Sequence, residues 1–127
     1  MARILIIDDD TELVQILTMA LQSCRHQVAS AGDPVAGFEV CRKFHPDIIL
    51  LDYHMPGDTG AHLFETFRRN QATSRTPILF MSAMASPEQI LGEVADPAVS
   101  RFIPKPIKLA ELKRNIGEML GPGGDEA

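Results

Sequence analysis

Short runs of apolar residues recur along the chain and alternate with segments in which apolar residues have helical spacing. The runs are largely continuous, which is typical of strands buried on both faces of a parallel sheet. The weakest of them, at 26–30, also contains polar residues. The five runs are RILII (3–7), HQVAS (26–30), DIILL (47–51), PILFM (77–81) and SRFI (100–103). This pattern predicts five strands.

The segment that follows each predicted strand has the pattern of a helix. Asp33-Pro34 fits an N-cap with proline at the first helical position, which opens a helix through about Phe44. Residues 86–89, SPEQ, fit a capping box with proline in the first turn. Apolar stripes mark the other three helices: Leu13, Ile16, Leu17, Ala20 and Leu21; Leu63, Phe64 and Phe67 within 60–70; and Leu109, Leu112, Ile116, Met119 and Leu120.

Alternation of strands and helices favours right-handed crossovers between parallel strands. We therefore predict an α/β fold, a doubly wound three-layer sandwich with a five-stranded parallel sheet and five helices. Residues 1–120 are predicted to form one domain, because a chain of 127 residues is long enough for one ordinary core but not for two. Residues 121–127, GPGGDEA, have nothing to pack and are expected to form a flexible tail or the stump of a linker.

Composition and charge narrow the classes of function. A net charge of −5, with Lys and Arg scattered along the chain, disfavours direct nucleic-acid binding by this chain. No apolar stretch reaches the roughly 20 residues that span a bilayer, and acidic residues follow the first apolar run too early for a signal peptide. We expect a cytoplasmic protein that does not insert into a membrane. Cys24 and Cys41 lack metal-ligand spacing and are expected to be reduced, packed thiols.

Polar residues follow four of the predicted strands. They are Asp8, Asp9 and Asp10 after the first strand, Asp52 after the third, Ser82 after the fourth and Lys105 after the fifth. The carboxyl ends of parallel strands meet at one edge of a sheet, so these residues are expected to gather there, and Asp8, Asp9 and Asp52 share one crevice if the strand order is 2-1-3-4-5. Taken singly, each residue has an ordinary structural explanation. The first three aspartates fit helix caps and Asp52 fits a turn residue. Ser82 fits a serine that bonds to the local backbone, and Lys105 fits a surface lysine. Their common location favours a functional site.

The residue types in this crevice indicate metal and phosphoryl chemistry. Clustered carboxylates repel one another, so either a pKa rises or a cation binds. Oxygen ligands without His or Cys suit Mg²⁺ or Mn²⁺. A phosphoryl group that bridges the metal, the Lys105 ammonium and the Ser82 hydroxyl satisfies all of these groups. Asp52 is then the nucleophile.

Four motifs stand in the order and at the spacing of a known family. They are ILIIDDD (4–10), LLDYHMPGDTG (50–60), MSA (81–83) and IPKP (103–106). From Arg3 to about Leu120 the chain resembles the receiver domain of two-component response regulators. This resemblance implies the flavodoxin-like fold of the chemotaxis-regulator type, with strand order 2-1-3-4-5.

The resemblance also implies a role for each residue of the crevice. Asp52 would be the phosphoacceptor, and Lys105 would contact the phosphoryl group. Asp9, Asp52 and the backbone carbonyl of His54 would ligate Mg²⁺. Asp8 would support the metal through water.

The switch of the family would lie on the later strands. Ser82 would be the hydroxyl that moves toward the phosphoryl group, and Phe102 would be the aromatic that changes rotamer, with Lys105-Pro106 as a cis peptide. The residues alone leave open whether Phe102 is a switch or a plain core aromatic. His54 and Met84 occupy the positions that tune phosphate lifetime. Met84 cannot orient an attacking water, so slow self-dephosphorylation is expected, and His54 is interpreted as solvated rather than as a gate.

The implied function is a phosphoacceptor in a two-component phosphorelay. A histidine kinase or a phosphotransfer protein would donate the phosphoryl group, and the chain would have no enzymatic activity beyond self-dephosphorylation. The face formed by the fourth helix, fifth strand and fifth helix would bind a downstream protein target, act on an output domain missing from this chain, or form a homodimer. Asp96-Pro97 interrupts the segment before the fifth strand, so the fourth helix is expected to be short or irregular.

Two other functions are considered. A phosphatase of the haloacid-dehalogenase type also ends an apolar strand on a nucleophilic Asp, but it needs a second Asp where this chain has His54, and no cap domain fits in 127 residues. An interaction module that is never phosphorylated would keep only the fold. The presence of all the acids together with Ser82 and Lys105 disfavours that alternative.

Overall fold

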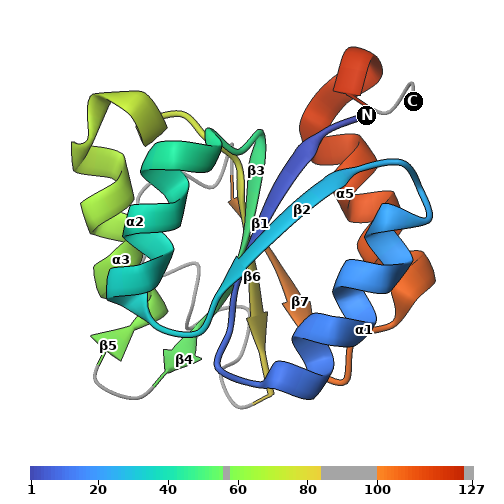
Figure 1. Cartoon of the computed structure of the whole chain (residues 1–127), viewed down its shortest axis with the longest axis horizontal. Coiled ribbons are helices and arrows are strands. Elements are labelled where there is room, and N and C mark those ends of the chain that lie inside the picture. Colours follow the sequence, from blue (N-terminus) through green and yellow to red (C-terminus); the bar gives the residue numbers. More distant parts are fainter. Residues whose placement is uncertain (56–57, 84–99, 125–127) are drawn as a thin grey trace.

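The computed structural model describes residues 1–55, 58–83 and 100–124 (Figure 1). Five parallel strands form one sheet in the order β2-β1-β3-β6-β7. Their bounds are β1 (Arg3–Ile7), β2 (Gln27–Ala31), β3 (Ile48–Asp52), β6 (Ile78–Ser82) and β7 (Ser100–Pro104). Numbered along the chain, these strands have the predicted order 2-1-3-4-5. The predicted fold class is confirmed.

Helices cover both faces of the sheet and complete a three-layer sandwich. In Figure 1, α2 and α3 lie on one side of the sheet, and α1 and α5 lie on the other. The helices of the described residues are α1 (Thr11–Gln22), α2 (Pro34–Phe44), α3 (Gly60–Arg69) and α5 (Leu109–Gly124), with a 3-10 turn, η1 (Gln71–Thr73). The fourth predicted helix, which begins at the capping box 86–89, lies outside the described residues.

Each face of the sheet has its own apolar core. Every residue of β3 and β6 is buried, as the continuous apolar runs predicted. Side chains alternate between the two faces, so Leu5 packs with the residues under α2 and α3, and Ile6 packs with those under α1 and α5. Complete burial of one such side chain contributes about 1.5–3 kcal/mol to folding.

Gly37 allows α2 to lie close to the sheet. It is a buried residue of α2, and a Cβ atom at this position would stand 2.8 Å from Ile7 Cδ1, 3.1 Å from its Cγ1 and 3.2 Å from its Cγ2. The absence of a side chain therefore sets the distance between α2 and β1.

The predicted start of α2 is confirmed, and one expected core residue of α1 is not. Asp33 is the N-cap of α2 and accepts a hydrogen bond from Ala36 N at 2.8 Å, with Pro34 at the first helical position. Ile16, which was placed on the buried stripe of α1, is 54% exposed. Ile16 lies about 100° around the helix from the buried Leu17, so it falls outside the stripe.

Two further features were not predicted. A two-residue antiparallel pair, β4 (His54–Met55) and β5 (Asp58–Thr59), follows β3. Near the C-terminus, Gly121 has φ 78° and ψ −179°, a non-helical conformation that interrupts α5 before Gly124. None of the helices in the described residues is long and apolar enough to cross a lipid bilayer.

Candidate functional site

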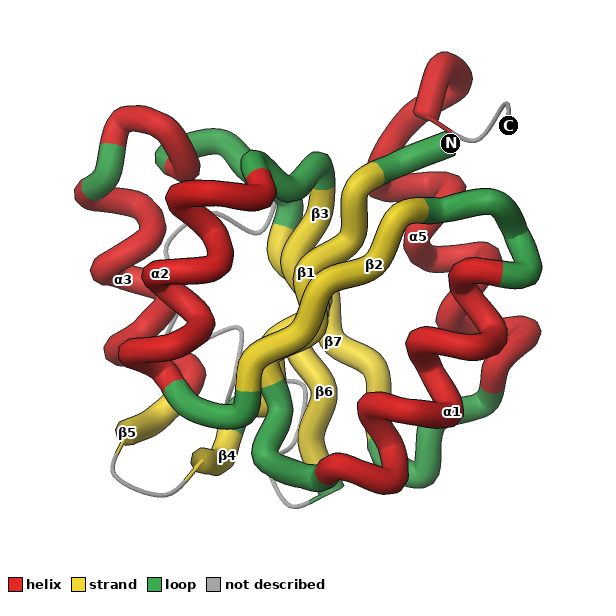
Figure 2. The backbone as a smooth tube through the Cα atoms, viewed as in Figure 1, coloured by secondary structure: helices red, strands yellow, loops and turns green. Residues whose placement is uncertain are grey.

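The predicted site residues come together at the carboxyl edge of the sheet, at the lower end of the sheet in the view of Figure 2. Asp8 directly follows β1, and Lys105 directly follows β7. Asp52 and Ser82 are the last residues of β3 and β6, so both strands end one residue later than predicted. β1 and β3 are neighbours in the sheet, which brings their terminal acids together.

Three carboxylates form a cluster at this edge. Asp8, Asp9 and Asp52 each offer an oxygen, and these oxygens lie within 4.8 Å of one another. Asp8 and Asp52 are only 2% and 4% exposed, whereas Asp9 is open to solvent. Carboxylate oxygens at this separation, without His or Cys, fit a hard divalent cation such as Mg²⁺.

Asp10 does not belong to the cluster. It is the N-cap of α1, and its Oδ1 accepts a hydrogen bond from Leu13 N at 3.1 Å. Its own backbone N–H donates to Asp8 Oδ1 at 2.9 Å, which holds the Asp8 carboxylate in place. Of the three consecutive aspartates, one therefore caps the helix and two face the site.

Lys105 brings a positive charge into the cluster. Its Nζ lies 2.9 Å from Asp8 Oδ2 and 3.5 Å from Asp52 Oδ1, and the side chain is 18% exposed. Its backbone N–H donates to Ser82 O at 2.9 Å, and the Lys105-Pro106 peptide is cis, as the resemblance implied. The backbone after β7 thus carries the ammonium group back over the ends of β6 and β3.

The electrostatic environment shifts the ionisation of two of these groups. Burial, together with the negative charge of Asp8, raises the pKa of Asp52 to about 6, although Lys105 and the His54 N–H act in the opposite direction. Burial lowers the pKa of Lys105, but its bond to Asp8 and the charges of both carboxylates outweigh this effect and raise it overall. Negative charge on Asp52 is therefore only partly compensated by the protein.

His54 approaches Asp52 through its backbone. Its N–H donates to Asp52 Oδ1 at 3.3 Å, whereas its imidazole is exposed. The imidazole meets the buried Tyr53 ring edge-on at 5.1 Å, and Tyr53 in turn meets Phe80 edge-on at 5.7 Å. This aromatic packing could not be predicted from the sequence, because it depends on the turn into β4.

Ser82 and Phe102 lie on the adjacent strands. Ser82 is 2% exposed, and Phe102 is partly buried beside Phe80 in the register of β6 and β7. Both residues line an open cleft of about 600 Å³ together with Lys105 and Arg114. Met84 lies outside the described residues.

Comparison with known protein families identifies one that spans most of the chain. The profile of the family described as response regulator receiver domain matches residues 4–117. The DNA-binding response regulator MtrA of Mycolicibacterium paratuberculosis is 31% identical over 125 residues, which are 98% of this chain and 53% of that protein. The transcriptional activator protein PfeR of Pseudomonas aeruginosa is 32% identical over 118 residues, which are 93% of this chain and 37% of that protein. The chain spans about half the length, or less, of these relatives.

Solved structures agree with the fold. The chemotaxis response regulator CheY4 of Vibrio cholerae superposes with a TM-score of 0.84 at 26% identity, covering 94% of this chain and 98% of that one. The receiver domain of the sensor histidine kinase PA1611 from Pseudomonas aeruginosa, which has a magnesium ion coordinated in its active-site cleft, gives 0.81 at 22% identity and covers 95% of this chain and 98% of that one. The family profile, the sheet order and the acidic edge agree, and the chain belongs to the response regulator receiver domain family.

Proposed function

We propose that Asp52 accepts a phosphoryl group from a phosphohistidine of a histidine kinase or a phosphotransfer protein. The observation that carries the proposal is the position of Asp52, buried at the end of a central strand between Asp8 and Lys105. An oxygen of Asp52 attacks phosphorus, the P–N bond to the donor imidazole breaks, and the imidazole leaves with the bonding electron pair and takes up a proton. The product is an acyl phosphate on Asp52.

Mg²⁺ would be held by Asp9, Asp52 and the backbone carbonyl of His54, with Asp8 acting through water. When bound, the metal supplies positive charge that offsets the repulsion between the acids and the incoming phosphoryl oxygens. The closeness of the three carboxylates and the raised pKa of Asp52 support this assignment. Mn²⁺ has similar ligand preferences and is expected to substitute.

Lys105 would neutralise the phosphoryl group from the other side. Its ammonium is already within ion-pair distance of Asp52, so a small movement takes it from the carboxylate to a phosphoryl oxygen. The group thus lies where negative charge accumulates during in-line transfer.

Phosphorylation would be read out on the face predicted for the fourth helix, β7 and α5, of which the structure describes the part formed by β7 and α5 (the β7–α5 face). Ser82 would turn toward the phosphoryl group, and Phe102 would pack further inward, which shifts an equilibrium between two conformations. The partly buried position of Phe102 in the cleft beside Ser82 supports this switch. Met84, two residues after Ser82 in the sequence, is expected to give slow self-dephosphorylation, and replacement by Glu should speed it.

The output would come from a protein target or from a further domain. MtrA and PfeR are named as a DNA-binding regulator and a transcriptional activator, and this chain matches about half or less of each. We infer that the receiver acts on such an output domain or docks on a separate partner in the cytoplasm, and that the β7–α5 face is also where a homodimer would form.

Incubation with a small phosphodonor such as acetyl phosphate, with and without Mg²⁺, tests the proposal. Intact-mass spectrometry should show a gain of one phosphoryl group that requires Mg²⁺ and is lost in Asp52→Asn. Asp33→Asn is the matched control, since Asn also caps helices and Asp33 is not one of the three clustered carboxylates. A non-phosphorylated interaction module would give no mass gain, and a phosphatase would instead release free phosphate with many turnovers.

A further inference from the structure

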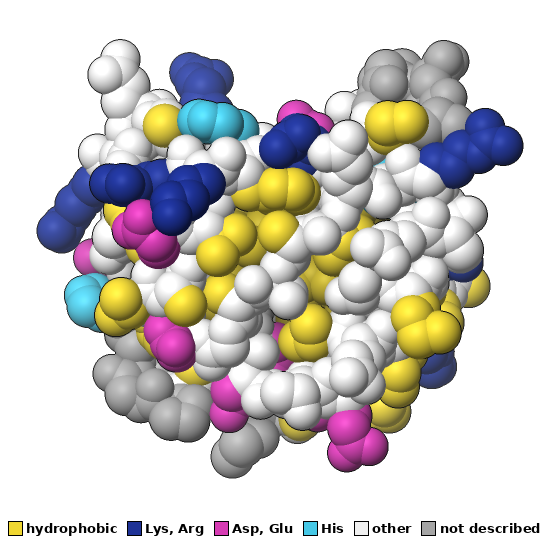
Figure 3. Space-filling model, in the orientation of Figure 1, with side chains coloured by type: hydrophobic (Ala, Val, Ile, Leu, Met, Phe, Trp, Pro, Cys, Tyr) yellow, Lys and Arg dark blue, Asp and Glu magenta, His cyan; other side chains and the backbone are white. Residues whose placement is uncertain are grey.

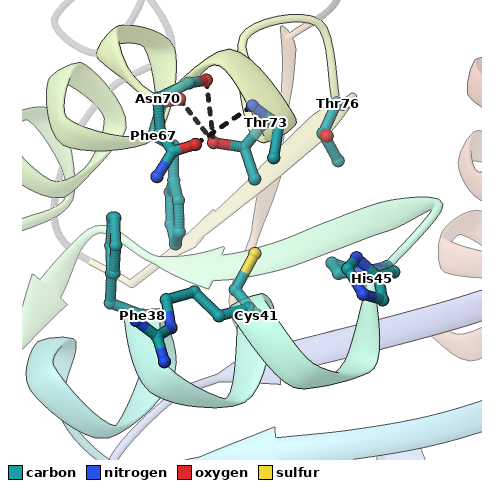
Figure 4. A pocket seen from close by; sticks show the side chains of 10 residues that line it. Phe38, Cys41, His45, Phe67, Asn70, Thr73 and Thr76 are labelled. Carbon is teal, nitrogen blue, oxygen red and sulfur yellow. Dashed lines mark hydrogen bonds between the residues drawn. The ribbon is translucent and has the colours of Figure 1, made fainter.

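A cavity lies between α2 and α3, at the end of the sheet opposite to Asp52. It is formed where α2 ends before β3 and where α3 passes through η1 toward β6, and its volume is about 160 Å³. Figure 4 shows it from close by, with Phe38 and Cys41 rising from α2 and Phe67 descending from α3. None of the residues assigned to phosphoryl transfer lines it.

One side of the cavity is apolar and suited to a flat ring. The rings of Phe38 and Phe67 stack with centroids 5.6 Å apart and an interplanar angle of 5°. Cys41 is 4% exposed, and burial raises the pKa of its thiol to about 11, so it remains neutral and apolar at physiological pH. A cavity of roughly 150 Å³ is known to hold one benzene molecule. The volume here therefore matches a single six-membered ring.

The backbone carbonyls at this end of both helices already have hydrogen-bond donors. Cys41 O accepts from His45 N at 3.1 Å. Phe67 O accepts from the Thr73 hydroxyl and from Asn70 N. These bonds, the first of which comes from the left-handed C-cap at His45, reduce the negative field that two helix C-termini would otherwise present to the cavity.

The polar lining consists of groups that can donate hydrogen bonds. Asn70 uses its Oδ1 to accept from Ala72 N at 3.0 Å, so its amide nitrogen is the part left for a ligand. His45 and Thr76 add an imidazole and a hydroxyl, which Figure 4 shows on the side away from the two Phe rings. Arg42 is the one fully charged residue of the lining, and no Asp or Glu lines the cavity. The Arg42–Glu39 contact is long, at 3.4 Å, and both side chains are exposed. Glu39 therefore competes only weakly with a ligand for the Arg42 guanidinium.

The charged residues around the cavity also favour an anionic ligand. The last turns of both helices are basic, with Arg42 and Lys43 in α2 and Arg68 and Arg69 in α3. In Figure 3, Lys and Arg side chains gather over this end of the molecule. Such a field attracts anions, although the chain as a whole is acidic.

We propose that this cavity binds a small organic monocarboxylate that carries one aromatic or similarly sized apolar ring. The ring enters beside Phe38, Cys41 and Phe67, and the carboxylate faces Arg42 and the donors of Asn70 and Thr76. The site is independent of phosphorylation at Asp52, so either proposal can fail without the other.

Benzoate is the probe, titrated into the full chain and followed by ¹H–¹⁵N NMR. For a ligand of nine non-hydrogen atoms, a dissociation constant on the order of 1 mM is expected from ligand-efficiency limits. Saturable shifts should centre on residues 38–45 and 67–76. Benzyl alcohol, which lacks the charge, and acetate, which lacks the ring, should each bind at least about tenfold more weakly. Absence of saturation, or equal binding of all three, overturns the proposal.

Two variants separate a built site from general attraction. Arg42→Gln should weaken benzoate about fivefold to tenfold, whereas Arg69→Gln, the same charge change on a residue outside the lining, should leave affinity within about twofold. Equal losses in both variants mean that the anion is held only by surface charge, which contradicts the proposal.

Cys41→Leu should fill the cavity and abolish binding. Because overpacking can prevent folding, Thr76→Val, which removes one hydroxyl at nearly constant shape, provides a second internal test with an expected loss of severalfold.

Discussion

The Nζ atom of Lys105 lies 2.9 Å from Oδ2 of Asp8, although β3 and β6 stand between the strands that carry these two residues. To make this contact, the Lys105 side chain passes over the end of β3, and it comes within 3.5 Å of Asp52 Oδ1 on the way. The lysine therefore acts as an internal counter-ion for the two buried carboxylates. A bound cation or a phosphoryl group would change the charge that Lys105 now balances.

Replacement of Lys105 by Met should affect metal binding and phosphorylation in opposite directions. Removal of the ammonium leaves the carboxylates less neutralised, so Mg²⁺ affinity measured by calorimetry is expected to rise by roughly threefold to tenfold. Phosphorylation by a small donor is expected to slow by about 100-fold, because the stabilisation of transition-state charge proposed for Lys105 is lost. Lys108→Met is the matched control, since Lys108 is exposed and outside the cluster. Weaker Mg²⁺ binding in Lys105→Met would show that the lysine is not a competitor of the metal.

The raised pKa of Asp52 predicts how the stability of the metal-free protein depends on pH. A folded-state pKa of about 6, above the ordinary value of 3.8, means that the folded state binds this proton more tightly than the unfolded state. The resulting stabilisation is full below about pH 4 and is lost as pH rises through 6. Asp52→Asn should therefore be more stable than the native protein at pH 7–8, by about 2–3 kcal/mol, and equal to it near pH 4.

Urea unfolding in EDTA at several pH values measures this difference. Asp33→Asn serves as the control, because an Asn N-cap preserves the helix start and Asp33 is not part of the acidic cluster. Addition of Mg²⁺ should reduce the advantage of Asp52→Asn at neutral pH, since the metal stabilises the ionised carboxylate. A difference between the two proteins that does not vary with pH would contradict the assigned role of burial.

The Mg²⁺ affinity of the native protein should itself fall with acidification. Protons and Mg²⁺ compete for Asp52, so binding measured by calorimetry should weaken progressively below about pH 6. Affinity that stays constant between pH 7 and pH 5 would indicate that Asp52 does not take part in the metal site.

Gly37→Ala tests the close packing of α2 on β1. The added methyl group would stand 2.8 Å from Ile7 Cδ1, so chemical denaturation should show destabilisation by about 1–3 kcal/mol. Gly32→Ala is the matched control, because a Cβ there meets nothing within 4 Å, and its stability should be unchanged or slightly higher. Ile7→Val removes the nearest atom and should recover part of the loss in the double variant.

The two cysteines should differ strongly in reactivity. Cys24 is partly accessible, whereas Cys41 is buried and burial raises its thiol pKa to about 11. A water-soluble disulfide reagent at pH 8 should modify Cys24 rapidly and Cys41 at least about 100-fold more slowly, through local opening. Cys24→Ser should retain only the slow phase. Two fast phases in the native protein would mean that the region around the α2–α3 cavity opens readily.

Much of the architecture follows from local patterns. Continuous apolar runs identified the buried strands, because a strand covered on both faces can accept few polar side chains. All five residues of β3 and all five of β6 are buried. The N-cap Asp33 could be recognised because capping depends on neighbours within one turn. The common edge of Asp8, Asp52, Ser82 and Lys105 followed from parallel strands alone, because their carboxyl ends all point the same way.

The remaining features depend on distances between segments that are far apart in the sequence. The resemblance assigned Asp9 to the metal site, but only the tertiary structure showed that Asp10 caps α1, because this depends on the turn of the backbone after β1. It also decided that Lys105 reaches Asp8 as well as Asp52, and that Ile16 faces solvent. The cavity between α2 and α3 exists because two helix ends, fixed on neighbouring strands, leave a gap that their side chains do not fill. Residue type and local spacing determine which groups reach the edge of the sheet, and packing determines which of them meet.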